Sequence, residues 1–560
     1  MEGPSPVIST GTIRIAVALA AMGVSIVSAA LSGEPAPEGP VEPTWESLKR
    51  CPIPEWVKDA KFGVYTHWGV YSVPAYETNV YGPEMYTPKG VLSKKGRDVR
   101  GYHEKTYGPI EKFGYKDFIP LFTAPRFDAA EWVGVMRDAG AKFGGICVVH
   151  HDGFCLWDSA FTRWNAMKMG PKRDIYGEIA HEIRKADLKL LATFHHARTY
   201  GAYHRFADQF TAEERKQLDI FDPRFRDFYQ NPETVTKDEF ATEWSSKISE
   251  VLRKYQPDMI WFDGLSGQLK NGIISEAKLL ETLAGYFNDA AKRGKQVALC
   301  NKLPSGKRWN FPPGVGLRSY ENGRDMEPDP RGWWLIDRAI SYPWTYVRGK
   351  KYSLTHQYHI SSLVDLVSRG GIFLLSLTPK GDGSIPDEEK RIMAKIGAWL
   401  RVNGEGIYGT RPWKVSGEGT PVAKIRQVRK KGKGEHATWN YKLLVENGRD
   451  VRFTRKDNTL YAFVLGVPPG RTITVAALAR GNVAKGGGGV KAVTMLGSEA
   501  KIEWDQTAQG MTLHFPDALP CEVAYGFRIT VNGTLDDSPR QALHDGVRRV
   551  GDFPVYDTDR

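Results

Sequence analysis

A carboxylate ends a short apolar run near the middle of the chain. The run Met259-Ile260-Trp261-Phe262 leads into Asp263, and Gly264 follows it. A buried apolar run that ends in this way is typical of a short strand that delivers an acid to the rim of a sheet. Because the active sites of parallel barrels lie at the carboxyl ends of their strands, Asp263 is our first candidate for a catalytic acid. An Asp at this place also makes turns or caps helices, so one carboxylate does not identify a site.

Other strand-like runs also end in polar or aromatic side chains. In a parallel barrel these strand ends would meet at one rim, where two carboxylates, five of the chain's 13 His and two Trp would form a cup. Such a cup suits a pocket that hydrogen-bonds sugar hydroxyls, stacks a ring and performs acid/base chemistry. The side chains concerned are His67, Trp68, His150, His151, His195, His196, Trp261, Asp263 and Glu321.

The elements that would position these side chains alternate between strand and helix. Repeated strand-then-helix order predicts a parallel sheet with helices outside it, and eight strands fit a (β/α)₈ barrel better than a doubly wound sheet. The first strand is not followed by a Gly-rich phosphate loop, which also disfavours a nucleotide-binding fold. The predicted strands are 62–68, 145–150, 188–195, 259–263, 297–301, 316–321, 344–347 and 371–377, and the main predicted helices are 129–139, 175–186, 237–255, 274–292 and 353–368.

The pattern of apolar and polar residues changes after Glu405. Short alternating runs separated by Gly, Pro and Asp predict an antiparallel β-sandwich. We place its strands at 459–464, 471–477, 490–496, 500–504, 511–515 and 522–531. The expected organisation is a signal peptide over 1–30, a linker over 31–44, the barrel over 45–408, the sandwich over 409–533 and a polar, poorly ordered tail over 534–560.

The N-terminal region and the cysteines indicate the compartment. Arg14 precedes an apolar run, 15–30, that ends in small residues, which is the pattern of a signal peptide and is short for a membrane span. We therefore expect an exported protein with no membrane association after cleavage, and an uncleaved anchor is the alternative. The five Cys match no metal motif and no dense disulfide framework, although one bridge is compatible with the sequence.

Charge and ligand types limit the partners. The formal net charge is +12, with basic residues spread along the chain. The simpler interpretation is that these basic residues form a solvated surface. The more specific interpretation is that they attract an anionic polymer. No nucleic-acid-binding motif is recognisable. A hydrolytic metal site needs three or more converging ligands, but the first strand offers His67-Trp68-Gly69 and not a His-x-His pair. We expect no metal and no cofactor.

Several segments together resemble the retaining α-L-fucosidase family of glycoside hydrolases. Residues 61–75 resemble the opening strand of that family, and His150-His151-Asp152-Gly153-Phe154 and Trp261-Phe262-Asp263-Gly264 resemble later motifs, the last being the nucleophile strand. Residues 401–408 resemble the stretch that closes the catalytic domain. The resemblance covers roughly residues 45–532 and, with these motifs in order, it is specific.

The resemblance implies a fold and roles for individual residues. It makes Asp263 the nucleophile that forms a glycosyl-enzyme, and it places His67, His150 and His151 on the fucose hydroxyls, with His195 near a sugar-contact position. A retaining glycosidase needs a second carboxyl about 5–5.5 Å away as acid and then base. Family members place that residue on a variable loop, so motif alone does not identify it. Glu321, which ends a strand, is our first choice and Glu327 the second.

The sequence departs from the family pattern at three places. Asn79 replaces an acidic sugar contact, Val149 replaces a Lys before the His pair, and Trp333-Trp334 replaces a Trp-Glu pair. These departures leave the exact sugar and linkage open, but not the reaction type.

We therefore predict an exo-acting retaining α-L-fucosidase that needs no cofactor. Its expected partners are fucosylated oligosaccharides or polysaccharides, with sulfated ones included because the chain is basic. The oligomeric state is left open. The alternatives are a catalytically silent carbohydrate-binding relative, a retaining glycosidase for a similar sugar such as a galactoside, and a metal-dependent hydrolase.

Overall fold

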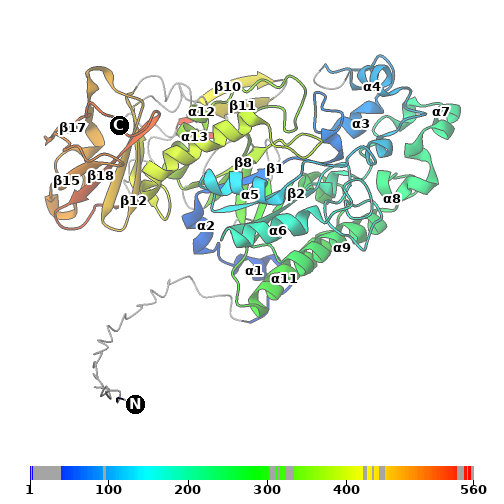
Figure 1. Cartoon of the computed structure of the whole chain (residues 1–560), viewed down its shortest axis with the longest axis horizontal. Helices are drawn as coiled ribbons and strands as arrows, with labels where there is room; N and C mark the ends of the chain where they lie inside the picture. The colour runs from blue at the N-terminus through cyan, green and yellow to red at the C-terminus, as the bar shows by residue number, and fades with distance from the viewer. Residues whose placement is uncertain are drawn as a thin grey trace.

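The computed structural model describes most of the 560-residue chain, in two main bodies (Figure 1). The described residues are 1, 3, 39–92, 96–302, 311–312, 314–321, 333–419, 426–431, 434–439, 448–538, 548–550 and 553–555. The predicted signal peptide, 1–30, and most of the predicted linker, 31–44, lie outside these residues.

The first body is a closed barrel of eight parallel strands in sequential order, with β1 paired to β8. The sequence predicts seven of the eight close to their observed bounds. The strands are β1 Phe62–Thr66, β2 Phe143–Val149, β3 Lys189–Phe194, β4 Met259–Phe262, β5 Ala298–Lys302, β6 Leu317–Glu321, β7 Trp334–Ala339 and β8 Gly371–Leu377.

Helices surround the barrel, and the longer ones pack apolar faces against it. Their N-termini carry the expected caps: the Asp128 side chain accepts from the backbone N–H groups of Ala130 and Glu131, and Thr236 and Glu239 form a capping box. The helices are α1 Trp45–Lys49, α2 Glu55–Ala60, α3 Tyr81–Met85, α4 Val99–Tyr107, α5 Ala129–Asp138, α6 Ile175–Lys185, α7 Ala212–Gln217, α8 Arg226–Tyr229, α9 Lys237–Tyr255, α10 Leu265–Lys270, α11 Glu276–Lys292, α12 His356–Ser368 and α13 Asp387–Asn403.

The barrel interior is a packed core at the end opposite the candidate site. Large side chains from alternate positions of the strands fill it, so the barrel is not a channel. Among them are Tyr65, Phe143, Leu191, Met259, Trp261, Cys300, Leu317, Leu335 and Leu374.

The second body consists of two antiparallel sheets that share one core. Phe453 and Phe527 from the larger sheet pack with Val475, Met511 and Leu513 from the smaller one. The larger sheet has the order β15-β18-β13-β12-β9 and the smaller one β14-β17-β16. The strands are β9 Arg411–Glu418, β12 Asp450–Lys456, β13 Thr459–Leu465, β14 Thr472–Val475, β15 Val490–Met495, β16 Trp504–Gln506, β17 Met511–His514 and β18 Ala524–Val531.

Buried polar contacts join the two bodies. Trp399 Nε1 of α13 donates to the Ala524 carbonyl oxygen at 2.8 Å, and the Gly526 N–H donates to Asn403 Oδ1 at 3.1 Å. The Arg452 Nε of β12 donates to Asp365 Oδ1 of α12 at 2.8 Å, with both side chains buried. The sandwich is therefore docked against the outer helices α12 and α13 and not against the mouth of the barrel.

Several expectations differ from the structure. The seventh strand is Trp334–Ala339 and not 344–347, which forms a loop. Strand 500–504 is displaced to Trp504–Gln506, and β9 and β12 lie outside the strands predicted from the sequence. Two further hairpins are present, β10 Arg426–Lys431 with β11 Gly434–Trp439, and β19 Arg548–Val550 with β20 Phe553–Val555, the latter inside the segment expected to be a poorly ordered tail.

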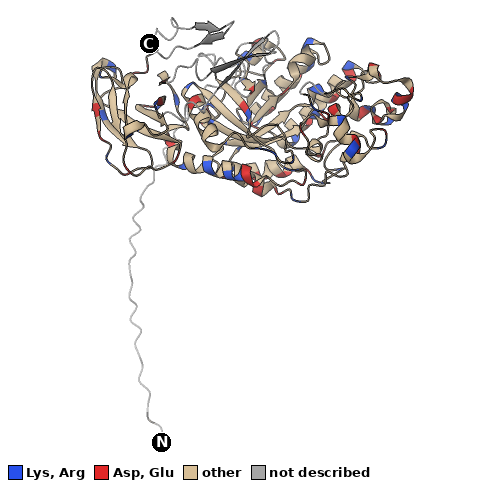
Figure 2. Cartoon of the chain, turned by 90° about the horizontal axis from the view of Figure 1, so that it is seen from above, with Lys and Arg blue, Asp and Glu red and all other residues tan. Residues whose placement is uncertain are grey.

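The surface and the thiols agree with the plainer sequence interpretations. Figure 2 shows Lys and Arg interspersed with Asp and Glu over the outer helices. All five Cys lie in the described part of the chain, and each is a free thiol, so they form no bridge with one another. Within the described residues, no helix is both long enough and apolar enough to span a bilayer.

Candidate active site

A single lysine lies among three carboxylates at the carboxyl ends of β4 to β7. The Lys302 Nζ is 3.3 Å from Asp263 Oδ1, 3.2 Å from Glu321 Oε2 and 3.6 Å from Asp337 Oδ2. Lys302 ends β5; the neighbouring strands β4 and β6 supply Asp263 and Glu321, and the next strand, β7, supplies Asp337. The side chain of Lys302 is 14% exposed, so its charge is largely sheltered from water. This lysine links the two acids that the sequence singled out.

Asp263 is held ionised by its surroundings. Burial raises the pKa of this carboxyl, but the positive charges of Lys302 and Arg198 and a hydrogen bond from His151 outweigh burial and hold the pKa well below its usual range. A buried carboxylate that stays charged and is partnered on both oxygens is suited to attack an electrophilic carbon. The backbone supports this placement, because Gly264 follows in the left-handed region with a φ of 72° and the Arg198 side chain packs against it.

His151 faces two acceptors at once. Its Nδ1 lies 2.7 Å from the His195 carbonyl oxygen and its Nε2 lies 3.3 Å from Asp263 Oδ2. A carbonyl oxygen and a carboxylate both accept, so each ring nitrogen of His151 lies next to an acceptor. His151 therefore orients the Asp263 carboxylate from the side opposite Lys302.

Two further His line the same cup in neutral form. Burial and the nearby charge of Lys302 lower the pKa of His67 to about 3, and burial together with the neighbouring His151 holds the pKa of His150 well below its usual range. His67 Nδ1 is 2.8 Å from Ser376 Oγ, and His150 Nε2 is 3.3 Å from Asn79 Nδ2. Neutral imidazoles of this kind both donate and accept, which suits hydroxyl groups.

Glu321 lies on the far side of Lys302 from Asp263. Its Oε1 accepts from Trp344 Nε1 at 3.2 Å, and the side chain is 32% exposed, more than the other two acids. The two oxygens that contact Lys302 are at most 6.5 Å apart, which is the sum of their distances to Nζ. Retaining glycosidases hold their carboxyls about 5–5.5 Å apart and inverting ones about 6.5–9.5 Å apart, so this upper limit is compatible with the retaining separation. Glu327 lies outside the described residues.

Asp337 is the third acid and is fully buried. It pairs with Glu321 in the β6–β7 ladder and accepts from Ser319 Oγ at 3.3 Å. Burial raises the pKa of Asp337 to about 7; Lys302 opposes this rise, and the negative charges of Glu321 and Asp263 add to it. The group therefore carries a proton through the acidic range while Asp263 stays ionised.

Two of the predicted side chains lie outside the cup, and two others form its floor, where His195 packs on His67 with ring centroids 5.1 Å apart and Lys302 Nζ lies 5.4 Å from the Trp261 ring centroid. His195 and Trp261 point into the barrel beneath it: His195 Nδ1 is 3.0 Å from Cys147 Sγ, and Trp261 packs on His195 with ring centroids 5.1 Å apart. Trp68 lies in the outer core against Phe122 and Trp132, with its Nε1 donating to the Lys380 carbonyl oxygen. Trp261 and Trp68 are buried, at 0% and 1% exposed, and their predicted sugar contact stays a prediction.

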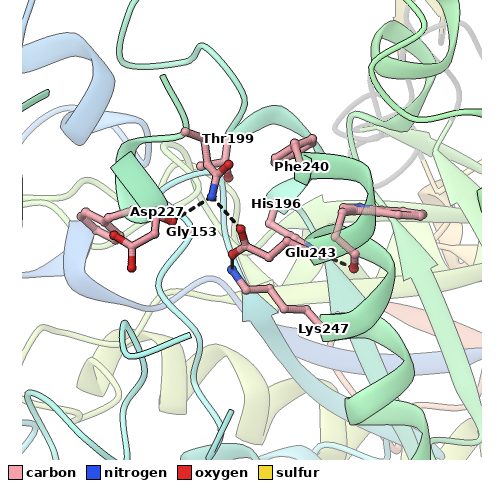
Figure 3. Close-up of a pocket in the computed structure, with 10 residues that line it drawn as sticks. Gly153, His196, Thr199, Asp227, Phe240, Glu243 and Lys247 are labelled. Atoms are coloured by element: carbon pink, nitrogen blue, oxygen red, sulfur yellow. Dashed lines mark hydrogen bonds and ion pairs between the residues drawn. The ribbon is translucent and has the colours of Figure 1, made fainter. Parts of the chain in front are cut away.

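His196 also departs from the predicted cup. It begins the short helix η3 His196–Arg198 after β3, and its side chain faces outward to α9, with Nε2 3.4 Å from the Trp244 carbonyl oxygen. Figure 3 shows the small cavity on that side, where Glu243 and Lys247 of α9 pair with each other. Unlike the consecutive His150 and His151, which both line the cup, His195 and His196 point to opposite sides of their strand end.

Lys302, Asp337 and Trp344 belong to the site but were not predicted from the sequence. The sequence signal that could have identified Lys302 is its position directly after a predicted strand. In the part of the chain that the structure describes, no group of three or more His, Cys, Asp or Glu side chains is arranged to hold a metal ion.

A pair of carboxylates that share one lysine, one ionised and buried and one partly exposed, above a closed parallel barrel, is typical of the site of a glycoside hydrolase. Residues 29–405 match the family model described as alpha-L-fucosidase, and residues 446–530 match that of the alpha-L-fucosidase C-terminal domain. The first match spans more than half of the chain. This protein belongs to the alpha-L-fucosidase family.

Individual relatives agree with that assignment. The chain is 28% identical to the tissue alpha-L-fucosidase of Rattus norvegicus over 502 residues, which is 87% of this chain and 92% of that protein. It is 31% identical to the plasma alpha-L-fucosidase of the same species over 386 residues, 67% of this chain and 74% of that one. The structure of the Thermotoga maritima alpha-fucosidase in complex with fucose matches with a TM-score of 0.64 and 27% identity, covering 87% of this chain and 99% of that one.

Proposed function

We propose that this protein removes terminal α-L-fucosyl residues from oligosaccharides or polysaccharides with retention of configuration, with Asp263 as nucleophile and Glu321 as acid and base. The observation that carries the proposal is the placement of Asp263 and Glu321 on one lysine at the carboxyl ends of the barrel strands. The similarity to the fucose-bound Thermotoga maritima enzyme supports fucose as the sugar.

The reaction takes two displacements. Asp263 attacks the anomeric carbon while the bond to the leaving oxygen breaks, and Glu321 gives its proton to that oxygen. Water then enters, Glu321 takes a proton from it, and the hydroxide adds to the anomeric carbon as the bond to Asp263 breaks. Consuming the charge of Asp263 in the first step removes a negative neighbour of Glu321, which favours the carboxylate form that Glu321 needs as base.

The neutral His and the amide beside them would recognise the sugar. His67, His150 and Asn79 form a connected polar surface next to the nucleophile, and His151 completes it. Each offers a donor or an acceptor to a ring hydroxyl. Where other members of the family carry an acid, Asn79 supplies a neutral amide, so this part of the pocket adds no negative charge.

The test of the nucleophile is chemical rescue. Asp263→Gly should lose at least about 10³-fold in turnover of an aryl fucoside, because the covalent step cannot form. Added azide should restore consumption of the substrate and yield a fucosyl azide. Wild-type activity in Asp263→Gly would overturn the assignment.

The test of the acid uses leaving groups. Loss of a general acid slows substrates with poor leaving groups far more than activated ones. Glu321→Gln should show that pattern, by about 10²-fold or more on a fucosyl disaccharide. If Glu327→Gln shows the pattern and Glu321→Gln does not, Glu327 is the acid.

We also propose export and a tolerance of sulfated substrates. The apolar run 15–30 after Arg14 supports a cleaved signal peptide, and the net charge of +12 supports attraction to sulfated fucans. N-terminal sequencing of the secreted protein tests the first, and a screen of sulfated against unsulfated fucans tests the second.

A further inference from the structure

One buried ammonium contacts the backbone on both sides of the tryptophan that touches Glu321. The Lys350 Nζ donates to the carbonyl oxygen of Pro343 at 3.0 Å and to that of Thr345 at 3.3 Å. Residue 344 lies between these two carbonyls. The same cation therefore holds the peptide group that precedes residue 344 and the one that follows Thr345.

Lys350 is itself anchored from behind. Its Nζ donates to Thr378 Oγ1 at 2.8 Å, just beyond the end of β8, and lies 3.9 Å from Glu389 Oε1 of α13. The side chains of Lys350 and Glu389 are 1% and 0% exposed. Glu389 in turn accepts from the Thr378 N–H at 2.8 Å and from the Tyr352 hydroxyl at 3.1 Å. The ammonium thus ties the 344 loop to two rigid elements of the barrel.

The held tryptophan faces the reacting groups. Trp344 Nε1 donates to Glu321 Oε1 at 3.2 Å, its ring packs on His67 with centroids 4.8 Å apart, and Lys302 Nζ lies 5.6 Å from the ring centroid. Since Lys302 holds the other oxygen of Glu321 at 3.2 Å, Trp344 and Lys302 contact separate oxygens of one carboxyl. Two donors on separate oxygens fix the rotation of the carboxyl plane, which one donor cannot do.

We propose that Trp344 and Lys350 are positioning residues for the acid/base: Lys350 fixes the loop, and the indole N–H of Trp344 sets the plane of the Glu321 carboxyl toward the leaving oxygen. The inference rests on the proposed role of Glu321. Proton transfer depends steeply on the alignment of the proton donor and acceptor. Loss of that alignment therefore slows the protonation of the leaving group more than it weakens sugar binding.

The first experiment removes the N–H and keeps the ring. Trp344→Phe should lower kcat on a fucosyl disaccharide by about 10-fold, the lower end of what a hydrogen bond to a charged group contributes. The KM and the rate on an activated aryl fucoside should change by less than about 3-fold. A double-mutant cycle with Glu321→Gln should show that Trp344→Phe costs less than about 2-fold once the acid is gone. Equal losses on both substrates, or an undiminished loss in the Glu321→Gln background, would overturn the inference.

The second experiment loosens the loop. Lys350→Met should reproduce the selective loss on the disaccharide, and Lys350→Gln, which retains two donors, should show a smaller one. If Lys350→Met does not fold, Lys350→Gln decides. The control is Lys351→Met, because residue 351 is exposed. Full activity on the disaccharide in the folded Lys350 variants would contradict the part assigned to this lysine.

The role proposed for Trp344 and the role proposed for Glu321 predict different results. If Glu321→Gln shows leaving-group dependence and Trp344→Phe does not, the role of Trp344 is wrong and the acid/base assignment stands. If Glu321→Gln shows no such dependence, the acid/base assignment fails and the positioning role fails with it.

Discussion

At the scale of single residues, Lys302 sets the charge of the site. Its removal should raise the pKa of Asp263, because burial then acts against a weaker set of positive charges. Asp263 would be protonated at higher pH, so the acidic limb of the kcat/KM profile of Lys302→Met should move up by about one pH unit or more, one unit being about 1.4 kcal/mol. Lys295→Met is the control, since Lys295 pairs with Asp258, 3.8 Å away, and is 42% exposed. An acidic limb that stays in place would contradict this role.

Asp337 gives a second prediction, about stability. Its pKa is raised to about 7 in the folded protein, from a usual value near 4. A raised carboxyl pKa favours the folded state most at low pH, and this contribution is lost as pH rises from about 4 to about 7. Asp337→Asn should therefore lower the pH dependence of stability: its unfolding temperature should match wild type near pH 4 and exceed it at pH 8. An identical fall in both proteins between these pH values would refute the assigned pKa.

The residues that the sequence could predict are those with a local signal. Asp263 and the His67, His150 and His151 side chains directly follow strong apolar strands, and strand ends converge in a barrel. Lys302 also follows a strand, but its role depends on the acids that the neighbouring strand ends place around it. Asp337 lies inside a strand, where a charged residue makes the segment look unlike a strand unless its partner is known.

At the scale of elements, β2 depends on close approach to β3. A Cβ at Gly145 would lie 1.9 Å from the Leu191 carbonyl oxygen, which is backbone and cannot rotate away. Gly145→Ala should destabilise the protein by about 2 kcal/mol or more through overpacking. It should also lower activity by displacing His150 and His151 at the end of β2.

Gly134→Ala supplies the matched control for that experiment. Gly134 lies in α5, and no atom lies within 4 Å of the position that an alanine methyl group would take there. Alanine at this position should therefore be neutral or stabilising by up to about 1 kcal/mol. The two sites are compared by measuring the thermal unfolding and the activity of Gly145→Ala and Gly134→Ala. Similar behaviour of both would show that β2 can shift without cost.

The apolar pattern predicts seven barrel strands because each is buried on both faces. It fails for β7, whose Asp337 and Arg338 break the apolar run, although both are buried in the fold. The predicted strand falls instead at 344–347, where Trp344 and Val347 look strand-like but belong to the loop that Lys350 holds. Whether each of these two segments forms a strand or a loop is decided by tertiary contacts, which no local sequence pattern encodes.

At the scale of the whole molecule, a buried ion pair docks the sandwich on the barrel. Burial raises the pKa of Asp365, but the charges of Arg369 and Arg452 outweigh burial and lower it. Arg452→Met should destabilise the docked protein by about 2–3 kcal/mol near neutral pH, less than for a broken isolated pair because Arg369 remains. The difference from wild type should shrink as pH falls and Asp365 is protonated.

The control for this pair lies on the same strand. Arg455 of β12 is 3.4 Å from Asp537, and both side chains are about one-third exposed, so Arg455→Met should cost no more than about 1 kcal/mol. Thermal unfolding of the full chain compares the two variants. A cost for Arg452→Met as small as that for Arg455→Met would refute the docking role. The sequence predicts the sandwich from its alternation, but which faces of the two bodies meet depends on side chains far apart in the chain.

The pairing of β1 with β8 also has a consequence in time. His67 at the end of β1 contacts Ser376 of β8, which comes 309 residues later. At roughly 5–20 residues per second of synthesis, the ribosome needs about 15–60 s to make the intervening chain. During that interval the first strand has neither its final neighbour nor its hydroxyl partner, so the sugar pocket cannot exist on a nascent chain that stops short of β8. A closed barrel therefore makes this enzyme inactive until nearly all of its first body has emerged.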